Sequence, residues 1–99
     1  MNTPPTDVTA KPPRLVLYSM PNCPHCRRLR QWLRSRGIQF REEEIGRNRR
    51  AFKEFQRLGG RTVPLLRAGD RTFGGFDPER LRKWFKQMGV PTSPKERKP

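Results

Sequence analysis

The sequence predicts an α/β fold with the element order β-α-β-α-β-β-α, arranged as a four-stranded mixed sheet with helices on both faces. Two strand-like stretches, 15–19 and 38–45, flank a helix-like stretch, and such a β-α-β start requires parallel strands. Two further strand-like stretches, 63–67 and 71–73, flank a glycine-containing turn at 68–70 and predict a hairpin. Because strands alternate with amphipathic helices, we expect helices over both faces of the sheet.

The first strand and the first helix have the clearest signals. The stretch 15–19 contains an uninterrupted apolar run, which is typical of a central strand. Asn22 is the expected N-cap of the helix, which runs to about Arg36 and ends at Gly37. Apolar residues at the spacing i, i+3, i+4 define the face that this helix buries. They are Leu29, Trp32 and Leu33.

The second strand and the second helix are marked by a change from apolar to charged residues. Within the predicted strand, 38–45, three successive glutamates at 42–44 indicate a solvated end or edge. The second helix is predicted over 48–58 and is followed by two glycines. We expect Phe52 and Phe55 to point inward from it.

The third helix and the limits of the domain follow from the C-terminal pattern. Asp77 is the expected N-cap, with Pro78 at the first helical position and Gly89 at the end. The apolar face of this helix is predicted to carry Leu81, Trp84, Phe85 and Met88. Both ends of the chain are rich in proline and poor in apolar residues. We therefore expect one domain over 14–88 between two disordered tails, 1–13 and the basic 89–99.

The chain is strongly basic, since 23 Lys and Arg against 9 Asp and Glu give a net charge of +14. Positive charge attracts acidic protein surfaces, glutathione and nucleic acid alike. The basic residues are spread along the chain without a base-reading motif, so we expect acidic protein partners rather than nucleic acid. The sequence shows neither a secretory signal nor an apolar run as long as a membrane span, and a reducing cytoplasm is the expected location.

The two cysteines of the chain stand two residues apart, in Cys23-Pro24-His25-Cys26, between the first strand and the first helix. A Cys-x-x-Cys in this position indicates a redox dithiol. At a helix N-terminus the Cys23 sulfur faces unpaired backbone N–H groups and the positive end of the helix dipole, which favour the nucleophilic thiolate. Cys26 follows one turn later, where it can attack a mixed disulfide formed at Cys23. Pro24 suits the first turn, because the N–H that proline lacks has no intrahelical partner there.

Other interpretations of the two cysteines stay open at this point. They can be structural thiols, half of a zinc site, or ligands of a metal or cluster shared between two chains. A zinc site within one chain is disfavoured, because a closed site needs four ligands and the chain offers two cysteines and one histidine. A Cys23–Cys26 bridge closes too small a loop to stabilise the fold usefully. The redox interpretation is therefore preferred, with no metal bound.

Three local signatures in this order resemble the glutaredoxin branch of the thioredoxin-like superfamily. They are Tyr18-Ser19-Met20-Pro21-Asn22-Cys23-Pro24-His25-Cys26, Arg61-Thr62-Val63-Pro64 and Gly74-Gly75-Phe76-Asp77. The resemblance covers about residues 14–88. It implies a thioredoxin-like (glutaredoxin) fold and a thiol–disulfide oxidoreductase that reduces protein disulfides or glutathione mixed disulfides.

The resemblance also implies roles for individual residues. Cys23 attacks and Cys26 resolves, while Pro64 is a cis proline that faces the dithiol. The main chain of Val63 pairs with a peptide-like substrate, as an added strand does. Residues of the second and third signatures are the expected glutathione and substrate contacts, namely Arg61, Thr62, Val63, Gly75, Phe76 and Asp77. No cofactor is expected to be bound tightly; glutathione is the expected reductant, and the protein is expected to be a monomer.

The chain departs from the glutaredoxin pattern at three positions. The motif contains His25 where tyrosine is usual, Met20 stands where a lysine often contacts glutathione, and Pro78 replaces a polar contact. The segment Gly75-Phe76-Asp77-Pro78 instead resembles the G-F-x-P of redoxins that feed ribonucleotide reductase and are recharged by thioredoxin reductase. One alternative is therefore a reductase-coupled redoxin with little use of glutathione. Another is a non-catalytic iron–sulfur or nucleic-acid-associated module, although Pro24 disfavours a cluster.

Overall fold

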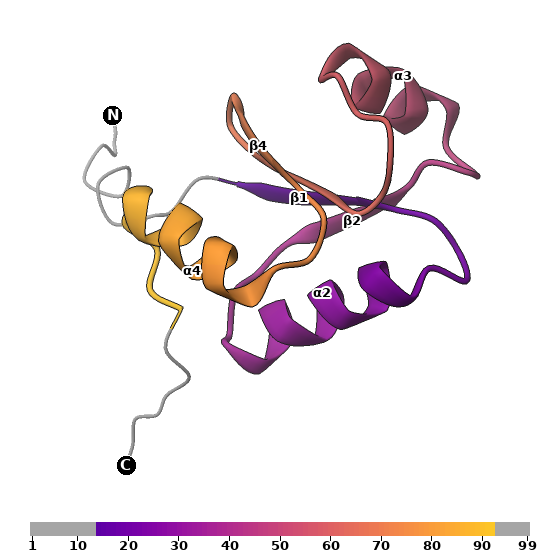
Figure 1. Cartoon of the computed structure of the whole chain (residues 1–99). Helices are drawn as coiled ribbons and strands as arrows, with labels where there is room; N and C mark the ends of the chain where they lie inside the picture. The colour runs from indigo at the N-terminus through magenta and orange to yellow at the C-terminus, as the bar shows by residue number, and fades with distance from the viewer. Residues whose placement is uncertain (1–13, 93–99) are drawn as a thin grey trace, which may run out of the picture.

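A computed structural model describes residues 14–92 of the chain. The predicted order of elements is confirmed (Figure 1). The elements are β1 (Leu15–Ser19), α2 (Pro24–Ser35), β2 (Arg41–Glu44), α3 (Arg49–Arg57), β3 (Leu65–Ala68), β4 (Arg71–Gly74) and α4 (Pro78–Gln87). The predicted tail 1–13 and residues 93–99 lie outside the described residues.

The sheet is mixed, and β1 lies inside it as predicted. Its strand order is β2-β1-β3-β4, with β1 parallel to β2 and antiparallel to β3, and β3 antiparallel to β4. The register places Leu17 opposite Glu42 of β2 and opposite Leu66 of β3. This register decides which side chains of the two neighbouring strands, β2 and β3, share a face with Leu17.

Two separate cores form because successive residues of β1 point to opposite faces of the sheet. Leu15 and Leu17 pack against α2 and α4, whereas Val16 and Tyr18 pack against α3. Figure 1 shows α3 on one side of the sheet and α2 and α4 on the other. The prediction of helices on both faces is therefore confirmed, and the larger core lies under α2, where the predicted inner face of that helix is buried.

The second strand is shorter than predicted and begins at Arg41. Ile38 and Phe40 pack against the α2–α4 core from the loop before the strand, and the glutamates that we expected to end the strand make up most of it. Backbone pairing with β1 explains this, because an edge strand needs only one paired neighbour and tolerates charged side chains.

The orientation of Phe52 was predicted wrongly. Its side chain is 41% exposed, whereas Ala51 and Phe55 of the same helix are buried. Ala51, Phe55 and the half-buried Leu58 recur at i, i+4 and i+7, and this narrow stripe is the one that faces the sheet. Phe52 falls one residue outside the stripe, and its partly exposed ring stacks on the ring of Phe55.

The fold also extends beyond its predicted limit at residue 88. Val90 is buried in the α2–α4 core, and its backbone N–H donates to the carbonyl of Phe85. Asp77 caps α4 with Pro78 in its first turn, as predicted. Trp84 and Met88 are partly buried rather than fully buried. Within residues 14–92, none of the helices has the length and apolar character needed to cross a membrane.

Candidate active site

Cys23 itself is the N-cap of α2, one residue later than the sequence suggested. Asn22 adopts a left-handed conformation, with φ of 59°, and belongs to the turn before the helix. Cys23 is extended and half-buried, and its sulfur accepts the backbone N–H of Cys26 at 3.2 Å. The sulfur thus lies directly at the positive end of the helix, where a thiolate is stabilised. His25, between the two cysteines, is exposed.

Cys26 differs from Cys23 in both exposure and protonation. Its side chain is fully buried, with an exposed fraction of 0%. Burial, reinforced by the neighbouring Cys23 sulfur, raises the pKa of Cys26 to about 12, and Arg30 opposes the rise. At neutral pH Cys26 is therefore a thiol that solvent does not reach, and Cys23 is the accessible sulfur.

The cis proline expected from the sequence is present. The Val63–Pro64 peptide bond is cis, and Pro64 is buried just before β3. Gly75, with φ of 88°, donates its N–H to the carbonyl of Pro64 at 2.9 Å. This bond places the second and third signatures side by side, although they are about ten residues apart in the chain.

An apolar pocket lies between Met20, three residues before Cys23 in the chain, and the loop that leads into β3. It encloses about 560 Å³. Its walls include Met20, Phe52 and Val63, and Arg61 and Thr62 complete one side. Met20 and Phe52 are the two large hydrophobic side chains exposed among the described residues. The mispredicted Phe52 thus shares an apolar pocket with Met20, which precedes the Cys23 motif, and with Val63, which precedes the cis proline.

A close glycine contact holds this loop in place. A Cβ atom on Gly60 would lie 2.6 Å from the ring of Phe55, so only glycine allows the chain to turn so close to α3. Arg61, Thr62 and Val63 follow at once and reach the pocket. The structure therefore brings three of the predicted substrate contacts together with Met20.

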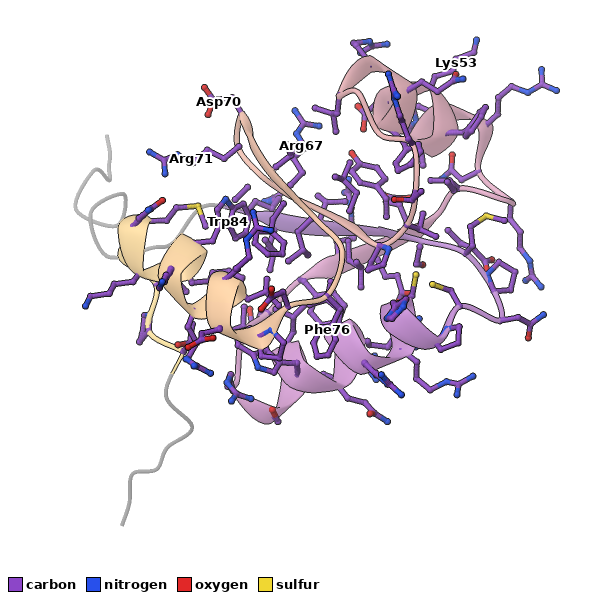
Figure 2. The ribbon with its side chains drawn as sticks, viewed as in Figure 1. Lys53, Arg67, Asp70, Arg71, Phe76 and Trp84 are labelled. Atoms are coloured by element: carbon purple, nitrogen blue, oxygen red, sulfur yellow. The ribbon has the colours of Figure 1, made fainter. Side chains whose placement is uncertain are left out.

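The third signature, Gly74-Gly75-Phe76-Asp77, leads into a helix start that offers an anion fewer free backbone N–H groups than expected. Pro78 has no N–H, and the N–H of Arg80 is taken by the carboxylate of Asp77 at 3.3 Å. The ring of Phe76 packs against the α2–α4 core and lies beside α2 in Figure 2. Of the glutathione contacts predicted in this segment, Gly75 bonds to Pro64, Phe76 packs against the core and Asp77 caps α4.

A charged network behind the dithiol was missed in the sequence. The carboxylate of Glu42 accepts the hydroxyl of Ser19 at 2.7 Å and the Nε of Arg30 at 2.9 Å, and it pairs with the second guanidinium nitrogen as well. Hydrogen bonds and charge from Arg30 hold the pKa of Glu42 below its usual range, and Ser19 adds to the effect. The signal available in the sequence was the spacing of Cys26 and Arg30, which places both residues on one side of a helix. Within residues 14–92 no three His, Cys, Asp or Glu side chains gather as a metal site would require.

The sequence of this chain is similar to those of known proteins. The family model described as glutaredoxin matches residues 15–73. The chain belongs to the glutaredoxin family. The glutaredoxin-like protein NrdH of Lactococcus lactis is 30% identical over 69 residues, which cover 70% of this chain and 96% of that protein. A glutaredoxin of Pseudomonas aeruginosa is 32% identical over 66 residues, covering 66% of this chain and 79% of that protein.

Solved structures agree with the family assignment. The NrdH-redoxin of Escherichia coli superposes with a TM-score of 0.64 at 26% identity, over 71% of this chain and 92% of that one. Glutaredoxin-like proteins are thiol–disulfide oxidoreductases, and so is this chain. The predicted family, thioredoxin-like fold and enzyme class are confirmed.

Proposed function

We propose that this glutaredoxin-like protein reduces disulfides of protein partners in the cytoplasm through Cys23 and Cys26, and that a thioredoxin-reductase-type flavoprotein recharges it in preference to glutathione. The observation that carries the proposal is the apolar pocket of Met20, Phe52 and Val63, because Met20 precedes the Cys23 motif and Val63 precedes the cis proline. An apolar surface at that place suits a protein side chain better than the carboxylates of a tripeptide.

The reaction divides between the two sulfurs. The Cys23 thiolate attacks one sulfur of the substrate disulfide, and the other substrate sulfur leaves as a thiolate that takes up a proton. Cys26 then loses its proton and attacks the Cys23 sulfur, so that the second substrate sulfur leaves. Two electrons pass to the substrate, and the protein keeps a Cys23–Cys26 disulfide. The half-exposed Cys23 and the buried Cys26 suit this order of events.

Two further observations favour a protein partner over glutathione. Met20 stands where the family resemblance places a glutathione-binding lysine, and Pro78 removes an N–H from the end of α4. A solved relative, the NrdH-redoxin of E. coli, is described as having a thioredoxin-like activity profile. Basic residues around the pocket, such as Arg61 at its wall and Lys53 extending outward from α3 (Figure 2), suit an acidic partner.

The test offers the oxidised protein two electron sources separately. One assay contains reduced glutathione, glutathione reductase and NADPH; the other contains thioredoxin reductase and NADPH. We expect reduction by thioredoxin reductase to exceed reduction by glutathione by at least about tenfold, the effect of roughly 1.4 kcal/mol of differential binding. Efficient turnover with glutathione and none with the reductase would refute the choice of reductant.

A variant at Met20 sharpens this test. Met20→Lys places a cation at the pocket wall, and we expect it to improve the use of glutathione and to weaken the interaction with the reductase. Met20→Leu is the matched control, because it keeps the apolar surface and should leave both rates within about twofold of wild type. If both variants behave alike, the charge at this position does not select the reductant.

A further inference from the structure

Ser19 is the one polar residue among the buried side chains of residues 14–92, and it lies at the end of β1 nearest the dithiol. Only 1% of it is exposed. A buried hydroxyl needs a hydrogen-bond partner, and Ser19 finds it in Glu42. Glu42 in turn holds Arg30 through two hydrogen bonds. The chain of contacts therefore starts in the core and ends on α2.

The geometry of the elements explains how these three residues meet. Leu17 and Ser19 are two residues apart on β1 and share the face that α2 covers, and the parallel register puts Glu42 beside Leu17 on that same face. On α2, Cys26 and Arg30 are four residues apart and so lie on one side of the helix. The guanidinium of Arg30 is thus bonded to the Glu42 carboxylate from a helix position one turn after Cys26, on the same side of α2.

We propose that Arg30, held in place by Glu42 and Ser19, is a positioning residue for the resolving step, where its fixed positive charge stabilises the thiolate that Cys26 must become. The proposal rests on the roles assigned to the two cysteines above. Cys26 gives up its proton as its sulfur attacks the Cys23 sulfur, and the bond between Cys23 and the substrate sulfur breaks. The leaving thiolate takes up a proton, so no outside oxidant or reductant takes part in this step.

The charges around Cys26 make this step dependent on Arg30. Burial and the Cys23 sulfur raise the pKa of the Cys26 thiol, whereas a hydrogen bond with the Met20 backbone and the charge of Arg30 lower it. In a mixed disulfide Cys23 carries no charge, so its repulsion disappears, and Arg30 is the remaining side-chain charge that acts on Cys26. His25, the neighbouring residue, is exposed, and Arg34 acts on Glu42 rather than on Cys26. The hydrogen bonds that Arg30 donates to Glu42 raise the pKa of Arg30, which stays charged throughout.

The ion pair with Glu42 holds the Arg30 guanidinium in one position. An arginine side chain at a helix surface has many rotamers, and ordering it costs conformational entropy. Two hydrogen bonds from one guanidinium to one carboxylate select a single arrangement, and the Ser19 hydroxyl fixes the carboxylate itself. The side chains of Arg30 and Glu42 are 26% and 28% exposed, so the pair is partly shielded from water and salt.

The experiment separates the two thiol steps with 5,5′-dithiobis(2-nitrobenzoate). Attack by Cys23 releases one coloured thiolate, and the later attack by Cys26 on the mixed disulfide releases the second. We expect Arg30→Gln to leave the first release within about twofold of wild type and to slow the second by roughly tenfold, with its pH profile displaced to higher pH. Arg30→Lys should recover part of the second rate, because the charge returns without the two fixed hydrogen bonds.

Two controls decide between a specific role and a general charge effect. Arg34→Gln removes the same charge one turn further along α2, from an exposed side chain, and should leave both releases nearly unchanged. Glu42→Gln should slow the second release by a smaller factor than Arg30→Gln. An unchanged second release in Arg30→Gln, or an equal effect of Arg34→Gln, overturns the proposal. A second release that survives in Cys26→Ser would instead overturn the assigned roles of the cysteines.

Discussion

The two sides of the dithiol differ in the residues that surround them: one side is apolar, and the other contains a network of charged residues. On the outer side, the segment that leads to Cys23 contributes Met20 to an apolar pocket whose other walls come from loops and from α3. On the inner side, Cys26 is buried one helical turn from a hydrogen-bonded charge network that joins β1, β2 and α2. The outer side is therefore suited to recognising a partner, and the inner side to controlling a proton.

This division explains why neighbouring residues of similar type have different surroundings. Phe52 and Phe55 stack on one another, yet the first is exposed at the pocket and the second is buried against Tyr18. Likewise, Cys23 and Cys26 are joined by a hydrogen bond, yet one can be reached from solvent and the other cannot. Recognition can thus change in evolution through loop residues such as Met20 without disturbing the chemistry beneath.

The largest expected effect distinguishes the two sulfurs. Cys23→Ser should abolish all disulfide reduction, because serine oxygen is not a nucleophile towards disulfides at neutral pH. Cys26→Ser should keep the first attack and accumulate a mixed disulfide between the protein and its substrate, visible by mass spectrometry. Iodoacetamide at mildly acidic pH should label Cys23 first; preferential labelling of Cys26 would contradict the assignment.

The next prediction compares Phe55 and Phe52, which are matched in size and lie on one helix. Phe55→Ala should lower the free energy of unfolding by about 3–5 kcal/mol, because it opens a cavity against the sheet. Phe52→Ala should change it by less than about 1 kcal/mol, since 41% of Phe52 is already exposed and the residue lies outside the buried stripe. Urea denaturation measures both values. Phe52→Ala should nevertheless weaken binding of the protein partner by about tenfold in a titration; no loss would remove Phe52 from the recognition surface.

The smallest expected effect is the pH dependence of the reduced protein. In the unfolded chain a cysteine titrates near pH 8.5, whereas the pKa of folded Cys26 is raised to about 12. The unfolded state therefore binds fewer protons between these values, so stability is complete below about pH 8.5 and falls as pH rises towards 12. The slope should approach about 1.4 kcal/mol per pH unit. Denaturation under reducing conditions at several pH values measures it.

The control for this titration is Cys26→Ala, which should lack that slope. The comparison is best kept below about pH 10, because burial also raises the pKa of Tyr18, which would add its own dependence at higher pH. Equal slopes in the two proteins would mean that Cys26 is as accessible to ionisation as it is in the unfolded chain.

Local signals in the sequence were enough for the order of elements, the central β1, the cap of α4 at Asp77 and the inner face of α2. These features depend on periodicity and on residues close together in the chain. The cis bond before Pro64 followed from the family resemblance and was confirmed. The mistakes concern Asn22, the start of β2, Phe52 and the limit of the fold at residue 88. For β2, Phe52 and Val90, packing or pairing with a neighbouring element decided the outcome.

The sequence by itself thus determined the fold class and the pair of sulfurs, because both depend on local patterns. These patterns are two cysteines one helical turn apart and the alternation of strands with amphipathic helices. Only the tertiary structure decided what surrounds those sulfurs. The parallel register of β1 and β2 brought Glu42 to Ser19 and Arg30, and the packing of α3 on its Ala51–Phe55 stripe turned Phe52 towards Met20. The physical reason is that strand register and helix rotation are set by the burial of all side chains together, so contacts between distant residues are fixed only when the layers assemble.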